Sequence, residues 1–244
     1  MKYLFLALIA IMAATLSSCI DGDEELYIEA DGSARVIAKY RIPALLFSDE
    51  DATDLKLSLA EEVGKQANLK LITNEIVKIE GYRVIHIEIA TDDLMELEDM
   101  LIDHGPEAEA NLSKGDELLH AILGSIDVKL KGLSADFTRD VDLSSMLDKH
   151  LGKRSAAILG DSKFSYTIHL PKAVEQSNAH WVENEGRTLK WVYKLSECRE
   201  KPISIKMVAS IPLPWWVYAI GAGITLLIAL LVWKLVKIMR PVVA

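Results

Sequence analysis

The sequence predicts an α+β fold: an antiparallel, hairpin-rich, curved sheet with helices packed on one face, plus a C-terminal transmembrane helix. Three observations predict this class. Short runs of alternating apolar and polar residues meet at glycine-containing turns, which is typical of β-hairpins. Other runs carry apolar residues at four-residue spacing, which is typical of amphipathic helices. The last long run, from Trp215 to Trp233, contains no charged residue.

The first half of the chain contains two expected hairpins around one expected helix. Residues 26–29 and 34–42 alternate and are joined by an Asp-Gly turn at 30–33, a strong hairpin signal. Residues 48–67 begin with several acids, which suit a helix N-terminus, and place Leu55, Leu59 and Val63 four residues apart. The second hairpin is expected at 69–79 and 82–89.

The second half of the sequence also predicts both strands and helices. We expect strands at 126–130, 133–137, 163–170, 188–195 and 203–209. We expect helices at 92–102, 116–123 and 143–151, with a surface loop at 104–115. Elements of both kinds therefore alternate along one exported domain, residues 19–210.

The N-terminus predicts a signal peptide of the lipoprotein type at residues 1–18. Lys2 leads an apolar run, and Leu16-Ser17-Ser18 follows directly before Cys19. In such signals the cysteine thiol receives a diacylglycerol, and fatty acids such as palmitate anchor the mature chain. The alternative is an ordinary signal peptide in which Cys19 occurs by chance.

The C-terminus predicts a transmembrane helix at 213–236 and a cytoplasmic tail at 237–244, because the stretch is long enough for a bilayer core. The expected membrane-anchoring residues are aromatic at both interfaces and basic on the inside: Trp215, Trp216, Tyr218, Trp233, Lys234, Lys237 and Arg240. This arrangement predicts a single-pass protein of the bacterial cytoplasmic membrane with its main domain extracytoplasmic. A buried core helix is the alternative.

Charge excludes one class of function. The chain has a net charge of −9, and all 36 acidic residues lie between Asp21 and Glu200. Such a surface repels phosphate backbones, so we expect no nucleic-acid partner. Any lipid would have to be bound in a pocket rather than by general attraction.

Candidate chemical sites are few, and we expect no enzyme, no metal and no cofactor. The six histidines form no metal-binding spacing, and no nucleophile or phosphate-loop motif is present. Residues 48–54 are rich in acids but lack the glycine of a calcium loop, so we interpret them as a helix N-terminus. Cys198 lies in a polar turn and is either a reactive thiol or an incidental one. Trp191 is an expected core residue, whereas Trp181 is expected in a loop as an anchor or a stacking platform.

The order of features resembles the LppM-like family of bacterial exported, membrane-anchored domains. The features are Cys19, the hairpin turn at 30–34, Pro171, residues 177–179 and the run 186–191. The resemblance implies a curved sheet wrapped on a helix, with a cavity for an acyl chain or glycolipid, and it implies no site residues.

Three functions remain open at this point. The first is a non-catalytic module that binds a lipid, a glycolipid or another envelope component. The second is an interaction subunit of a membrane protein complex. The third is an enzyme whose site is assembled from scattered acids. An apolar cavity would favour the first, and a filled core with exposed apolar residues would favour the second.

Overall fold

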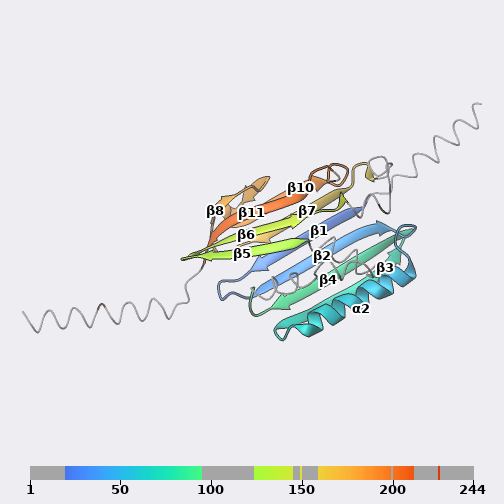
Figure 1. Ribbon diagram of the computed structural model, residues 1–244, viewed down its shortest axis with the longest axis horizontal. Coiled ribbons are helices and arrows are strands. Elements are labelled where there is room, and N and C mark those ends of the chain that lie inside the picture. Colours follow the sequence, from blue (N-terminus) through green and yellow to red (C-terminus); the bar gives the residue numbers. More distant parts are fainter. Residues whose placement is uncertain are drawn as a thin grey trace, which may run out of the picture.

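The computed structural model describes residues 20–94, 124–144, 149, 159–198, 200–211 and 225, which form two β-sheets and one long helix (Figure 1). The larger sheet contains β1 (Asp21–Ile28), β2 (Ala34–Pro43), β3 (Leu69–Ile79), β4 (Tyr82–Thr91), β7 (Lys163–His169), β9 (Trp181–Glu183) and β10 (Thr188–Lys194). The smaller sheet contains β5 (Ser125–Lys131), β6 (Ser134–Val141), β8 (Val174–Ser177) and β11 (Ile203–Ser210). The helix is α2 (Asp49–Lys65), and a short 3₁₀ turn, η3 (Asn184–Gly186), precedes β10.

The strand order shows how the chain builds the two sheets. The larger sheet has the order β3-β4-β2-β1-β7-β10-β9, and the smaller has β5-β6-β11-β8. The expected hairpins β1–β2, β3–β4 and β5–β6 are all confirmed, because local turn chemistry specifies them. One pairing differs from the expected antiparallel sheet: β1 and β7 run parallel. No sequence pattern marks that pairing, since its partners are far apart in the chain.

The expected fold class is wrong for the described residues. They are mostly strand and contain one long helix, whereas we expected several helices packed on one face. The helices expected at 92–102, 116–123 and 143–151 lie largely outside the described residues. Residues 48–67 do contain the expected helix, α2.

The expected transmembrane helix and single-pass membrane location are also corrected. Within the described part of the chain, no helix is both long enough and apolar enough to cross a bilayer. Apart from Thr225, the predicted span at 213–236 and the tail at 237–244 lie outside the described residues.

One face of the larger sheet is covered by two different elements. The cross-strand register places Ile87, Ala38, Glu24, Tyr166 and Trp191 in one row on this face. Over β3 and β4, α2 contributes its buried side chains Leu55, Leu59 and Val63. Over the β1 and β7 region, the smaller sheet contributes Phe137, Arg139 and other buried side chains of β6 and β11. The core is therefore shared by a helix and a second sheet, and Trp191 is a core residue as predicted.

The start of β1 and the end of β11 lie at opposite ends of the elongated domain. In Figure 1, β1 begins at the right, beside the end of β2 and the β3–β4 turn, and β11 ends at the left, beside the β5–β6 turn. The register agrees, since Asp21 pairs with Arg41 and Ser210 pairs with Ser134. We call the end where β1 begins the N-terminal end.

Candidate functional site

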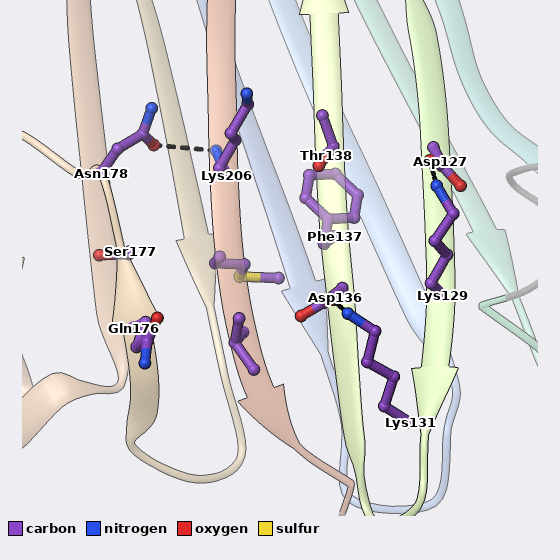
Figure 2. A pocket seen from close by; sticks show the side chains of 12 residues that line it. Asp127, Lys129, Lys131, Asp136, Phe137, Thr138, Gln176, Ser177, Asn178 and Lys206 are labelled. Atoms are coloured by element: carbon purple, nitrogen blue, oxygen red, sulfur yellow. Dashed lines mark hydrogen bonds and ion pairs between the residues drawn. The ribbon is translucent and has the colours of Figure 1, made fainter.

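The described residues contain an open groove on the outer face of the smaller sheet (Figure 2). Its volume is about 520 Å³. The side chains that line it come from all four strands of that sheet and from the residue after β8: Asp127, Lys129, Lys131, Asp136, Phe137, Thr138, Gln176, Ser177, Asn178, Lys206, Met207 and Val208. Most of them are polar or charged, so the groove suits a hydrophilic ligand better than an acyl chain.

Strand alternation explains why polar side chains gather there. On β6, Phe137, Arg139 and Val141 are buried, so the residues between them point outward. On β11, Ile203, Ile205 and Met207 are buried in the same way. The register then places Lys206 opposite Thr138, and Val208 opposite Asp136, on the outer face. Because the apolar side chains of β6 and β11 face the larger sheet, the polar side chains that alternate with them face the groove.

The charges in the groove are only partly balanced. Lys129 forms an ion pair with Asp127, and Lys131 forms one with Asp136. Lys206 is exposed, and no described residue forms an ion pair with its ammonium group. The lining therefore presents one more basic than acidic side chain, on a chain whose net charge is −9. A negatively charged group is the natural partner for Lys206.

One wall of the groove is held rigid by the side chain of Asn178. Its Oδ1 accepts hydrogen bonds from the backbone N–H of Lys206 at 2.8 Å and from the Trp191 indole at 2.9 Å. Its Nδ2 donates to the carbonyl of Ser204 at 2.9 Å. Because Trp191 belongs to the larger sheet, Asn178 links the two sheets and fixes the backbone that carries Lys206.

A second polar cluster is buried between the sheets. The Arg139 guanidinium makes two hydrogen bonds to the Glu24 carboxylate, the longer at 3.2 Å, and lies 4.7 Å from the centre of the Tyr166 ring. The Tyr40 hydroxyl donates to the same carboxylate. Burial raises the pKa of Tyr40 well above its usual value, and burial also raises the pKa of Tyr166 to about 12. Burial alone would lower the pKa of Arg139, but the Glu24 carboxylate reverses this and raises it.

This buried cluster is a structural link rather than a site for chemistry. Glu24 and Arg139 are both about 3% exposed, so a substrate has no access to them. Each belongs to a different sheet, and each satisfies the charge of the other. A paired and hydrogen-bonded buried charge of this kind holds two surfaces in one relative position.

The predicted lipid-attachment residue, Cys19, lies just before the described residues, as do all residues of the signal peptide. The neighbouring Ile20 is described, and its backbone N–H donates to the hydroxyl of Ser162 at 2.8 Å. Ser162 is completely buried. The chain is thus attached to the folded core one residue after Cys19. The membrane-anchoring residues predicted at the other end, Trp215, Trp216, Tyr218, Trp233, Lys234, Lys237 and Arg240, lie outside the described part.

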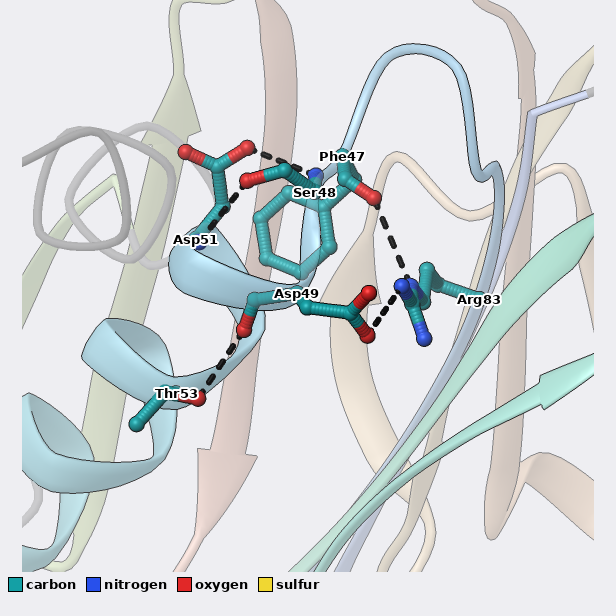
Figure 3. Close-up of polar contacts among 6 residues, drawn as sticks. All are labelled: Phe47, Ser48, Asp49, Asp51, Thr53 and Arg83. Atoms are coloured by element: carbon teal, nitrogen blue, oxygen red, sulfur yellow. Dashed lines mark hydrogen bonds and ion pairs between the residues drawn. The ribbon is translucent and has the colours of Figure 1, made fainter.

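The acid-rich segment at 48–54 is a helix N-terminus, as predicted (Figure 3). The Ser48 hydroxyl accepts from the backbone N–H of Asp51, and the Asp51 carboxylate accepts from the N–H of Ser48. Arg83 is buried and binds the Asp49 carboxylate at 2.5 Å. These carboxylates are therefore used by the fold. Across the part of the chain that the structure describes, no group of three or more metal-ligating side chains occurs.

The remaining candidates are placed as follows. Cys198 is buried, in contrast to the polar environment that its neighbours suggested, and burial raises the pKa of its thiol to about 11. His86 and His169 lie in strands, as predicted, and His169 stacks on Tyr27 at 4.3 Å. Trp181 lies in the edge strand β9 rather than in a loop, and is half exposed.

Sequence reasoning missed the groove residues, Lys206 and Asn178 above all. Alternation along β11 does predict that Lys206 points away from the core. No local signal shows that Asn178 binds two sheets, because its partners are 13 to 28 residues away in the chain.

Comparison with known proteins assigns no family. No protein-family model and no curated protein matches the sequence. Among solved structures, the chain is similar to the NMR structure of the folded domain of the Mycobacterium tuberculosis LppM protein. The sequence identity is 14%, the TM-score is 0.47, and the match covers 81% of this chain and 93% of that chain. A similarity of this size does not decide the family or the function.

Proposed function

We propose that this chain is a non-catalytic, lipid-anchored binding module of the bacterial cell envelope. Its ligand is the hydrophilic headgroup of a glycolipid, or a segment of envelope glycan, that carries a phosphate or carboxylate group. The observation that carries this proposal is the groove of the smaller sheet, where the exposed Lys206 has no ion-pair partner among the described residues. Gln176 and Thr138, beside it in the lining, offer an amide and a hydroxyl for sugar hydroxyl groups.

The chemistry of the groove favours a headgroup over an acyl chain. Binding an acyl chain requires an apolar cavity, because each methylene removed from water contributes about 0.8 kcal/mol. This groove is open, and its outward side chains are ammonium, carboxylate, amide and hydroxyl groups, with Val208 as the apolar exception. The face of the larger sheet beneath it is filled by the side chains of the core. We therefore place the ligand in this surface groove rather than in the apolar cavity that the family resemblance implies.

The sequence of the N-terminus supports an envelope location for the module. Cys19 follows Leu16-Ser17-Ser18 after an apolar run, which is typical of lipoprotein signals. Ile20 is bonded to Ser162, so a lipid on Cys19 would hold the domain directly at a bilayer rather than on a long tether. A ligand in the same envelope layer would then be within reach.

The experiment compares ligand binding by the full chain and by two matched lysine variants. The detergent-purified protein is incubated with glycolipids and phospholipids extracted from the envelope, and bound molecules are identified by native mass spectrometry. We expect an anionic adduct on the wild type and a large loss of it in Lys206→Ala. Lys163→Ala is the control, because Lys163 is an exposed lysine on the larger sheet. No adduct from any anionic class, or equal binding by both variants, contradicts the proposed ligand site.

A protein-interaction role is the second candidate, and one observation favours it. The edge strand β9 exposes Trp181 at 50% and Val182 at 54%. Exposed tryptophan is enriched at the centres of protein interfaces. A photocrosslinking amino acid at position 181 in cells would capture a specific partner if this strand is an interface. Reproducible capture there, together with an empty groove, would place this function first.

A further inference from the structure

The N-terminal end of the domain carries a group of exposed apolar side chains. Leu45 is 96% exposed, in the loop between β2 and α2, and Val77 and Ile79 on β3 are about half exposed, at 46% and 51%. The backbone N–H of Ala44 donates to the carbonyl of Gly81 at 2.8 Å, so the loop with Leu45 is tied to the β3–β4 turn. We call Leu45, Val77 and Ile79 the apolar tip. Exposed apolar side chains grouped at one end of a domain, rather than one exposed leucine, are what marks a contact surface.

The register places the apolar tip beside the start of the folded chain. Asp21 of β1 pairs with Arg41 of β2, Arg41 pairs with Val84 of β4, and Val84 pairs with Val77 of β3. These residues form one row across the sheet. Adjacent strands are about 4.8 Å apart, so Val77 lies roughly 14 Å from the first residue of β1 along that row. Figure 1 shows the same end of the domain at the right, with the β3–β4 turn beside the start of β1.

The chain between the predicted lipid and this row is short. Cys19 precedes Asp21 by two residues, which span at most about 7 Å when extended. Ile20 is also held by the buried Ser162. A diacylglycerol on Cys19 would therefore enter a bilayer close to the N-terminal end, with the apolar tip within reach of the same bilayer.

We propose that the apolar tip is a second membrane contact: Leu45, Val77 and Ile79 enter the interfacial layer of the bilayer that holds the Cys19 lipid, and so set the orientation of the domain. This inference rests on the lipid anchor of the proposed function. The occupant is a lipid surface because the anchor and the tip share one end of the molecule. The groove lies on a different surface, the outer face of the smaller sheet.

The charges beside the tip are compatible with insertion by apolar burial alone. Arg41 is paired with Asp21 at 2.9 Å and lies 4.6 Å from the centre of the Tyr82 ring. Lys78 and Glu80, on either side of Ile79, carry opposite charges. These four charges cancel, and the acidic residues of the adjacent first turn of α2 are Glu50, the capping residue Asp51, and Asp49, which is paired with Arg83. The other end of the domain supplies a matched control, because Leu133 in the β5–β6 turn is also exposed, at 59%, beside the end of β11.

The test places an environment-sensitive fluorophore at each end of the full-length, lipid-modified protein. Leu45→Cys and Leu133→Cys are labelled separately and reconstituted in vesicles of phosphatidylethanolamine and phosphatidylglycerol that contain lipids with a shallow nitroxide quencher. Cys198 stays unlabelled because it is buried and its thiol pKa is about 11. A lipid-modified Cys19 has no free thiol, and a fatty-acid probe confirms its modification in both variants.

We expect the probe at position 45 to shift its emission to the blue and to lose most of its intensity to the lipid quencher, and the probe at position 133 to do neither. Equal behaviour of the two probes overturns the inference. So does a probe at position 45 that is shielded from water but not quenched by lipid, since a protein partner would then cover the tip. A chain without lipid on Cys19 overturns the inference together with the anchor, whereas failure of the groove experiment alone leaves the tip in place.

Discussion

At the scale of single residues, the contact between Glu24 and Arg139 decides how the two sheets meet. Both side chains are buried, and each neutralises a charge that the other would leave unpaired in the core. Desolvation makes such a pair a weak source of net stability, but removal of one partner is costly because the other remains buried and charged. The pair therefore specifies the position of the smaller sheet on the larger one.

The first prediction tests this contact by removing one partner. Arg139→Ala should lower the free energy of unfolding by about 3–5 kcal/mol, because Glu24 is left buried without its counter-charge. Lys70→Ala, which removes the exposed pair of Lys70 and Asp92, should change it by less than about 1 kcal/mol. Urea unfolding followed by far-ultraviolet circular dichroism measures both. Equal losses in the two variants would contradict the role of the buried pair.

A second residue-scale prediction concerns the thiol of Cys198. Burial raises its pKa from 9.0 to about 11, so at pH 8 the reactive thiolate is about a hundredfold rarer than for an ordinary cysteine. Iodoacetamide at pH 8 should leave Cys198 unmodified in the folded protein and modify it fully in urea, as measured by mass spectrometry. Raising the pH toward 11 should increase the rate without urea. Rapid modification of the folded protein at pH 8 would show that the thiol is accessible.

At the scale of elements, β5 depends on a glycine at its start. Gly124 has a positive φ of 65°, and a Cβ there would lie 2.4 Å from the backbone oxygen of Asp140 on β6. Gly132, in the β5–β6 turn, has a φ of 63° but no atom near the position of a Cβ. The two glycines thus have nearly the same φ and differ in the space around them.

The third prediction compares these two glycines. Gly132→Ala should cost about 1–2 kcal/mol of stability, from the left-handed conformation alone. Gly124→Ala should cost at least about 2 kcal/mol more, because the overlap with β6 has to be relieved by moving backbone. Denaturant unfolding of both variants measures the difference. Because β6 carries the groove residues Asp136 and Thr138, Gly124→Ala should also weaken ligand binding in the groove. Equal stabilities of the two variants would contradict the overlap of the Gly124 Cβ with β6.

At the scale of the whole molecule, the two proposed binding surfaces are separated by the way the sheets are joined. The groove lies on the outer face of the smaller sheet, and the apolar tip lies at the N-terminal end of the larger one. Asn178 and the pair of Glu24 and Arg139 connect these sheets. Because the two sheets are held together, contact of the tip with a bilayer would also fix the orientation of the groove. The groove would then face a defined direction in the envelope.

The fourth prediction concerns the attachment of the whole domain. A fatty-acid probe fed to cells should label the wild type and Cys198→Ser, and should not label Cys19→Ser, because only the first cysteine follows a lipoprotein signal. In-gel detection of the probe measures this. Equal labelling of wild type and Cys19→Ser would refute the anchor and, with it, the membrane contact at the tip.

Local sequence signals predicted the hairpins and the long helix correctly, although the predicted fold class was wrong. The Asp-Gly turn at 30–33 predicted the first hairpin, and the acids and the four-residue apolar spacing within 48–67 predicted α2, because each signal involves residues only a few positions apart. The apolar run and Cys19 likewise predicted a lipid anchor from neighbouring residues alone.

The tertiary structure alone decided how these elements are assembled. The parallel pairing of β1 and β7, the short strands β8 and β9 and the division into two sheets join residues far apart in the chain, and no local pattern records them. The pair Glu24 and Arg139 spans 115 residues, so an acid and a base that look like surface charges in the sequence become a buried link. The groove and the apolar tip exist only because separate strands are brought side by side, since alternation fixes the face of a side chain but not its neighbours.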